Sequence, residues 1–141
     1  MKTLKTLAAA LLMFLSFSSF AADETKSEKL LMDYTVKIYI DAVSHGKMKG
    51  LSQVLDSDAK FTFTRNNEIY NYGKRDYLEF LKSTENIEQN CVTKSSIIDL
   101  NSTQSIVKVM MQYEGFTKIV HISLAKTSEG WKITNISNSF L

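Results

Sequence analysis

Apolar residues recur three to four positions apart between residues 28 and 46, which is the spacing of an amphipathic helix. The stripe consists of Leu31, Tyr34, Ile38 and Ala42, widened by Leu30 and Thr35. Thr25 and Glu28 have the spacing of a capping box at the start of this helix. His45 and Gly46 are expected to end it, because glycine readily takes the left-handed conformation that closes many helices.

Two shorter helices are predicted further along the chain, each from a cluster of apolar residues at helical spacing. Their apolar positions are Leu51, Val54 and Leu55 in the first and Tyr77, Phe80 and Leu81 in the second. The run Asp56-Ser57-Asp58 favours a turn and is expected to end the first of them. The second is predicted over residues 75–83.

An aromatic hairpin is predicted between these two helices. Phe61 and Phe63 alternate with polar residues, as in a half-buried strand, and Asn66-Asn67 suits a two-residue turn because asparagine tolerates positive φ. If the turn is tight, Phe63 faces Tyr70 and Phe61 faces Tyr72. Two aromatic pairs on one face would form a large apolar surface.

The remainder of the chain is predicted to form four strands, because each run is rich in β-branched and aromatic residues and is bounded by turn-forming residues. The runs are 92–100, 106–113, 116–126 and 131–140. Strands joined by short turns pair as hairpins, so the main sheet is predicted to be antiparallel.

A two-residue turn at Glu114-Gly115 would decide which residues share a face of this sheet. The opposed pairs would be Tyr113–Phe116, Val109–Val120, Val107–Ile122, Leu124–Ile133 and Lys126–Trp131. One face is then apolar and suits a core, with Val107, Val109, Met111, Tyr113, Phe116, Val120, Ile122, Leu124, Trp131 and Ile133. The other face is mixed, with Ile106, Lys108, Met110, Gln112, Thr117, Ile119, His121, Ser123, Thr134 and Ile136.

The first 21 residues have the three parts of a secretory signal peptide. Lys2 and Lys5 precede an unbroken apolar run at residues 7–15, and Ser19-Phe20-Ala21 fits the small-x-small cleavage rule. The run is short for a retained anchor, since a bilayer needs about 20 apolar residues. We therefore expect a mature chain from Ala22, with cleavage one residue later as the alternative.

This interpretation predicts a signal peptide at 1–21, a flexible lead-in at 22–27 and one domain at 28–141, in a periplasmic or secreted protein. The 141 residues include 17 Lys+Arg and 15 Asp+Glu, and loss of Lys2 and Lys5 with the leader leaves equal numbers. A neutral mature chain argues against nucleic acid as a partner. Cys91 is the only cysteine, so an intrachain disulfide is excluded, and a small buried residue is a simpler interpretation than a reactive thiol.

Three short motifs accompany the order helix, short helix, hairpin, helix and long sheet. They are Tyr39-Ile40-Asp41-Ala42, His45-Gly46-Lys47 and Leu55-Asp56-Ser57-Asp58-Ala59. Together they resemble the lumazine-binding branch of the nuclear transport factor 2-like (NTF2-like), SnoaL-like superfamily. Two departures stand out: Asp56-Ser57 replaces the His-Pro of the family pattern, and Gly46-Lys47 replaces a frequent Gly-Asp. A role carried by that histidine therefore does not transfer.

The resemblance implies an α+β, cone-like fold in which a curved antiparallel sheet wraps around the N-terminal helix, with two short helices. It also implies a pocket at the open end of the cone and a homodimer formed through the outer sheet face. The candidate pocket residues are Tyr39, Phe61, Phe63, Tyr70, Tyr72, Tyr77, Met111, Tyr113 and Trp131. They suit a small hydrophobic or aromatic ligand, and simple core packing is the alternative for each of them.

Asp58 is the best candidate for proton chemistry, because it precedes the first strand near the expected pocket and a buried carboxylate can have a raised pKa. A turn or capping role is the alternative. His121 falls on the mixed face opposite Lys108, and His45 is explained by its helix end. Two isolated histidines give no metal-site signature, and no glycine-rich loop indicates a cofactor.

The preferred hypothesis is an exported, non-catalytic domain that binds a small ligand as a homodimer. It needs no metal, cofactor or nucleic acid, and it does not contact a membrane after cleavage of the leader. One alternative is a SnoaL-like isomerase, cyclase or dehydratase that uses Asp58 with a tyrosine. Another is a protein-interaction module that uses the apolar residues of the mixed face. Those residues are Ile106, Met110, Ile119 and Ile136.

Overall fold

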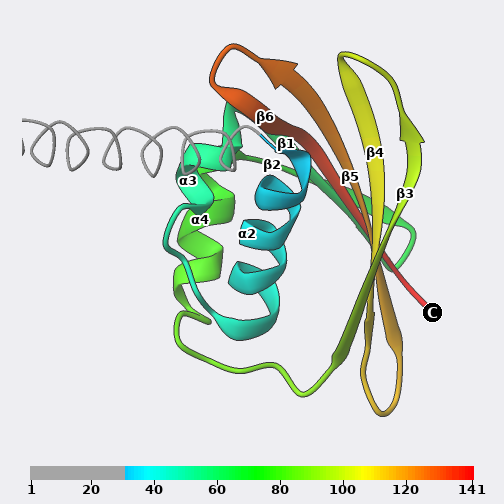
Figure 1. The fold of residues 1–141 in the computed structure, drawn as a ribbon. Coiled ribbons are helices and arrows are strands. Elements are labelled where there is room, and N and C mark those ends of the chain that lie inside the picture. The colour runs from blue at the N-terminus through cyan, green and yellow to red at the C-terminus, as the bar shows by residue number, and fades with distance from the viewer. Residues whose placement is uncertain (1–30) are drawn as a thin grey trace, which may run out of the picture.

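The computed structural model of the protein describes residues 31–141 (Figure 1). The expected signal peptide, the lead-in and the capping box of Thr25 and Glu28 lie outside these residues. The elements in chain order are α2 (Met32–His45), α3 (Leu51–Val54), β1 (Leu55–Arg65), β2 (Glu68–Gly73), α4 (Lys74–Lys82), β3 (Val92–Leu100), β4 (Gln104–Gln112), β5 (Thr117–Thr127) and β6 (Gly130–Phe140). No helix in this part of the chain is long and apolar enough to cross a membrane.

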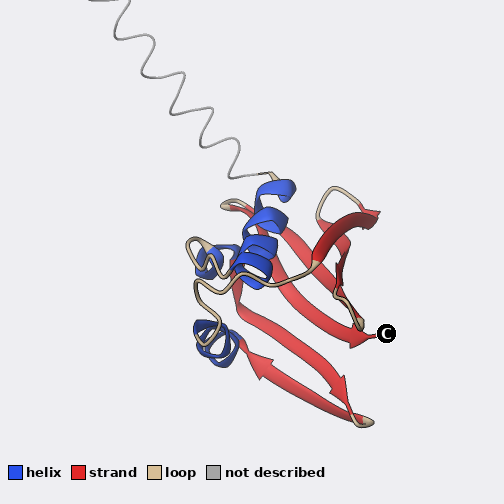
Figure 2. Ribbon diagram, turned by 90° about the horizontal axis from the view of Figure 1, so that it is seen from below, coloured by secondary structure: helices blue, strands red, loops and turns tan. Residues whose placement is uncertain are grey.

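The strands form one curved sheet in the order β2-β1-β6-β5-β4-β3, and the helices lie on one face of it (Figures 1 and 2). We call this the inner face and the opposite one the outer face. Helix α2 packs against β6, whereas α4 packs against β1 and β2. This arrangement confirms the predicted α+β, cone-like fold.

Helix α2 is held against the sheet by the predicted apolar stripe. Its buried side chains include Val36, Tyr39 and Ala42, and the Thr35 hydroxyl donates to the Trp131 carbonyl oxygen at 2.8 Å. The helix ends as predicted at Gly46, which has a φ of 64°.

The turns set the predicted pairing of the hairpins. Asn66 and Asn67 have φ angles of 53° and 64°, as a tight two-residue hairpin turn requires. The predicted opposition of Phe63 with Tyr70 and of Phe61 with Tyr72 is confirmed. The predicted pairs in the main sheet are also confirmed, namely Val109–Val120, Val107–Ile122, Lys108–His121, Leu124–Ile133 and Lys126–Trp131.

Strands β3 to β6 pair antiparallel as predicted, whereas β1 pairs with β6 in parallel, so the complete sheet is mixed. Most of the domain separates these two strands, so no turn fixes their direction. The predicted turn at residues 56–58 is wrong, because the short helix ends one residue early and these residues belong to β1 where its register with β6 shifts. There the Asp58 amide donates to Asp56 Oδ2 at 3.0 Å, so the turn-forming residues make an irregularity within the strand.

The assignment of Ile136 to the mixed outer face is also wrong. The register between β5 and β6 shifts next to Ser123, so that Leu124 pairs with Ile133 while Ile122 pairs with Ile136. Thr134 is the extra residue of this β-bulge, and its hydroxyl donates to the Ser123 carbonyl at 3.2 Å. Ile133 and Ile136 therefore both face inward and are at most 1% exposed.

The core lies between α2 and the inner face, where Tyr39, Val109, Val120 and Ile122 are fully buried. Phe116, expected in the core, is 45% exposed and stacks on Tyr113. This happens because the strands have already ended at this turn.

Candidate functional site

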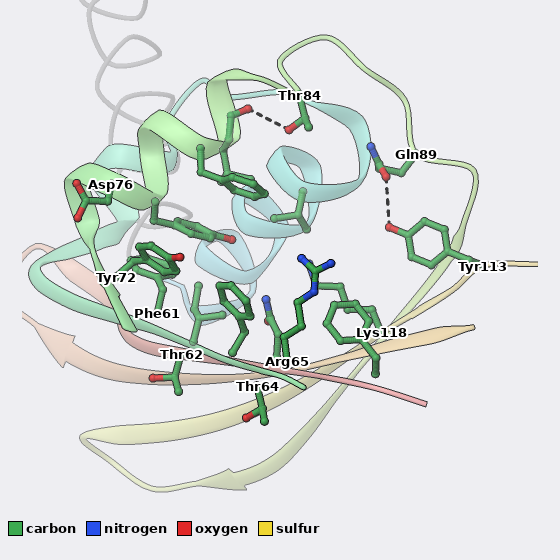
Figure 3. Close-up of a pocket in the computed structure, with 18 residues that line it drawn as sticks. Phe61, Thr62, Thr64, Arg65, Tyr72, Asp76, Thr84, Gln89, Tyr113 and Lys118 are labelled. Atoms are coloured by element: carbon green, nitrogen blue, oxygen red, sulfur yellow. Dashed lines mark hydrogen bonds between the residues drawn. The ribbon is translucent and has the colours of Figure 1, made fainter. Parts of the chain in front are cut away.

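A cavity of about 640 Å³ opens between the β1–β2 hairpin, helix α4 and the inner face, near the start of β5 and the end of β6 (Figure 3). Most of its lining surface is apolar, and polar side chains are placed at several points around it. That balance is typical of small-molecule pockets, whose usual volume is roughly 300–1,000 Å³.

One side of the cavity is a set of stacked aromatic rings, which we call the aromatic wall: Phe61, Phe63, Tyr72 and Tyr77. The Phe61 and Tyr77 rings are 3.7 Å apart between centroids, with 13° between their planes. The Phe63 and Tyr72 rings are 5.6 Å apart, again with 13° between planes. The hairpin register brings the Phe61, Phe63 and Tyr72 rings together. Helix α4 adds the Tyr77 ring.

Three polar side chains from the sheet form what we call the basic end of the cavity: Arg65, Lys118 and Asn138. Arg65 ends β1, Lys118 is the second residue of β5 and Asn138 lies near the end of β6. The Asn138 Oδ1 atom is buried and has no hydrogen-bond partner among the described residues. Burial lowers the pKa of Lys118, an effect that the Cys91 thiol partly opposes.

The loop after α4 closes another side of the cavity and is fixed to the end of α2. The Asn86 amide donates to the Gly46 carbonyl at 2.9 Å, and the Gln89 amide donates to the Ser44 carbonyl at 2.7 Å. These bonds hold Thr84 and Gln89 at the cavity, where the Tyr113 hydroxyl donates to Gln89 Oε1 at 3.4 Å.

Two tyrosines that line the cavity, Tyr77 and Tyr113, are neutral hydrogen-bonding groups near pH 7. Burial raises the pKa of Tyr77 to about 12. Burial and the neighbouring Cys91 thiol raise the pKa of Tyr113 to about 12 as well. In the core behind the cavity, burial, strengthened by Tyr77 and Tyr113, also raises the pKa of Tyr39, whose hydroxyl lacks a partner among the described residues. The Tyr77 and Tyr113 hydroxyls can orient a ligand but are poor general bases.

Five of the nine candidate pocket residues line the cavity, namely Phe61, Phe63, Tyr72, Tyr77 and Tyr113. Tyr39 and Met111 are buried in the core instead. Tyr70 stacks on Phe63 without lining the cavity, and Trp131 lines a separate hollow of about 420 Å³ beside α2. Binding of a ligand by these residues stays a prediction.

The candidates for proton or metal chemistry lie away from the cavity. Asp58 is exposed and is not among the lining residues. His121 pairs with Lys108 across the sheet, and His45 contacts Glu88 at the surface. Within residues 31–141 no group of three or more histidine, cysteine, aspartate or glutamate side chains is placed to hold a metal ion.

The sequence analysis missed the basic end. Lys118 has the same parity along β5 as Val120 and Ile122, so it belongs to the inner face, but the list of core residues passed over it because it is charged. A lysine within an otherwise apolar strand face is the signal that could have identified it. Asn138 had no such signal, because its direction depends on the β-bulge.

Solved structures similar to this chain include proteins described as NTF2-like and of unknown function. One from Silicibacter pomeroyi DSS-3 is 12% identical over 78% of this chain and 92% of its own, with a TM-score of 0.67. One from Shewanella baltica OS155 is 12% identical over 76% and 88%, with a TM-score of 0.61. One from Rhodospirillum rubrum ATCC 11170, described as NTF2-like and of unknown function in nutrient uptake, is 17% identical over 79% and 98%, with a TM-score of 0.59.

These likenesses show that the fold is NTF2-like. No curated protein matches the chain. The family model described as "Putative lumazine-binding" matches residues 27–138, which is nearly all of the predicted domain. The resemblance found in the sequence motifs is thereby confirmed, and the chain belongs to this lumazine-binding family of NTF2-like proteins.

Proposed function

We propose that the protein is an exported, non-catalytic domain that binds a small, flat molecule in the cavity. The observation that carries this proposal is the cavity itself, in which an aromatic wall stands beside a basic end. The family description, lumazine-binding, supports a flat heterocyclic ligand. Nearly parallel rings at Phe61 and Tyr77 offer a planar apolar surface to such a molecule.

Binding without turnover is favoured by the chemistry of the lining. The raised pKa values of Tyr77 and Tyr113 keep their hydroxyls protonated. Asp76 is the one carboxylate among the residues that line the cavity, and it is exposed at the N-terminal turn of α4. Asp58, the residue that the enzymatic alternative requires, has no place in the lining.

Export and dimerisation complete the proposal. Export is supported by the basic, apolar and small-residue parts of the first 21 residues. A homodimer through the outer face is supported by Ile106, which lies on that face and is 39% exposed, and by the partly exposed Met110 beside it.

Native mass spectrometry of the protein exported to a bacterial periplasm tests all three parts. We expect a dimer of chains that start at Ala22 and carry a reproducible additional small mass. A Val43→Trp variant should lose this mass, because Val43 is half-buried on α2 and lines the cavity. Ser52→Trp is the matched control, since Ser52 is exposed on α3 outside the cavity.

Equal retention of the mass by both variants would place the ligand elsewhere. A ligand-free protein that also fails to bind any flat aromatic probe would refute binding in the cavity. Circular dichroism of both variants checks that the tryptophan substitutions leave the fold intact.

A further inference from the structure

Lys118 occupies a position where the sheet otherwise buries apolar side chains. It lies directly across from Met111 on β4 and from Phe140 on β6, and Val120 two residues later is fully buried. Its side chain extends into the cavity from the inner face (Figure 3). Burying an ammonium group is costly unless an anion or several acceptors compensate for the lost water.

The protein supplies no such anion to Lys118. No ion pair is formed by Lys118 or by Arg65 among the described residues. Asp76 lies on the opposite side of the cavity, on α4 (Figure 3). The remaining groups near Lys118 are the Cys91 thiol, the Tyr113 hydroxyl and the Asn138 amide, and none of them is a carboxylate.

Arg65 adds a second positive charge to the same end of the cavity. It is the last residue of β1, and Figure 3 shows its side chain reaching into the cavity from the sheet. A guanidinium group presents paired N–H donors that match the two oxygens of a carboxylate or of a related oxyanion. Beside both cations, the buried Asn138 amide still lacks one hydrogen-bond partner.

We infer that the ligand is an aromatic acid, whose carboxylate, sulfonate or phosphate is held by Lys118 and Arg65 while its flat body lies along the aromatic wall. Asn138 then hydrogen-bonds to a polar group next to the acid. This inference rests on the proposed function, because it names the class of molecule for the same cavity. The basic end thus selects for a negative charge and the aromatic wall for a flat ring, and one ligand must have both.

Two fluorescent dyes distinguish the contribution of the acidic group to binding from that of the aromatic body. Anilinonaphthalenesulfonate is an aromatic anion, and N-phenylnaphthylamine has the same ring system without the sulfonate. We expect the wild-type chain from Ala22 to bind the anion at least about tenfold more tightly than the neutral dye, the scale of one charge-assisted hydrogen bond. Fluorescence titration of both dyes at fixed ionic strength measures this ratio.

Variants of single lysines test whether the basic end causes the preference for the anionic dye. Lys118→Met keeps the length of the side chain and removes its charge, so it should weaken anion binding about tenfold and leave the neutral dye unchanged. Lys118→Arg should retain the preference for the anion. Lys108→Met is the matched control, because Lys108 lies on the outer face of the same sheet, opposite His121, and should change neither affinity.

The outcomes distinguish this inference from the proposed function. Equal affinity for the two dyes, or a Lys118→Met variant that binds the anion as wild type does, overturns the inference and leaves cavity binding intact. A loss of anion binding in Lys108→Met also overturns it, since the dye then sits on the outer face. If neither dye binds, the proposed function fails, and the inference fails with it.

Discussion

Replacement of Gly46 by alanine tests how the loop behind the cavity is held. Gly46 has a φ of +64°, and a Cβ atom there would lie 2.6 Å from both the Asn86 nitrogen and the Thr84 oxygen, and 2.7 Å from the Ile87 nitrogen. All three are backbone atoms, so none can move aside by a side-chain rotation. The loop would have to move away from α2 and would strain its hydrogen bonds to Gly46 and Ser44.

Gly50→Ala is the matched control for the loss of stability expected in Gly46→Ala. Its φ is +87°, but a Cβ atom there would meet nothing closer than the Ile38 Cδ1 atom at 3.5 Å, which is an ordinary contact. Both substitutions incur the left-handed backbone cost of about 1–2 kcal/mol. Only Gly46→Ala adds an overpacking cost of about 1–3 kcal/mol. We expect destabilisation of about 2–5 kcal/mol at Gly46 and about 1–2 kcal/mol at Gly50.

Urea unfolding of the two variants, followed by circular dichroism, measures the difference. Gly46→Ala should also weaken binding of anilinonaphthalenesulfonate, because Thr84 and Gln89 are held at the cavity by the loop. Gly50→Ala should leave dye affinity unchanged. If the two glycines give equal losses of stability, the close approach of the loop does not contribute, and the packing argument is refuted.

Three further predictions concern single residues. Lys118→Met should stabilise the ligand-free protein by about 1–3 kcal/mol at pH 7, the usual scale for relieving an uncompensated buried polar group. Burial lowers the pKa of Lys118 in the folded protein below its ordinary value of 10.5. Between the folded and the unfolded pKa the unfolded chain binds more protons, so the stability of the wild type should rise with pH and approach that of Lys118→Met. Urea midpoints of both proteins at several pH values test this. Asp58→Asn should change stability by less than about 0.5 kcal/mol and leave dye affinity unaltered, since Asp58 is exposed outside the cavity, and a loss of binding in the same dye titration would contradict the assigned site. Phe61→Ala should cost about 3–5 kcal/mol in urea unfolding, because Phe61 is 3% exposed and stacks on Tyr77, and a cost below about 1 kcal/mol would show that the aromatic wall is loosely packed.

The parts of the fold that could be predicted from the sequence are those set by local turns. Asn66-Asn67 determines the β1–β2 register, and the turn after Tyr113 determines the pairing of Val109 with Val120. The parallel pairing of β1 with β6 has no local signal, because it depends on how the whole sheet closes over α2. Hydrophobic periodicity cannot distinguish a parallel neighbour from an antiparallel one.

The aromatic half of the site could likewise be predicted, whereas its basic half could not. Phe61, Phe63 and Tyr72 share a face through a hairpin that the sequence specifies. The same reasoning could not separate Tyr39, which is core, from Tyr77, which reaches the cavity, because both occupy inward positions on helices. A search for apolar residues also passes over Lys118, although its place on the strand is determined by the same turn.

The β-bulge next to Ser123 connects the wrong assignment of Ile136 with the composition of the site. If β6 had no bulge and alternated strictly from the inward Ile133, residues 135, 137 and 139 would point inward. The bulge instead turns Ile136, Asn138 and Phe140 inward, and all three line the cavity. Two of them supply apolar surface, and Asn138 brings the unpartnered amide to the basic end. The irregularity that periodicity could not foresee is therefore the feature that gives β6 its share of the candidate site, as expected where a bulge redirects side chains beside a binding site.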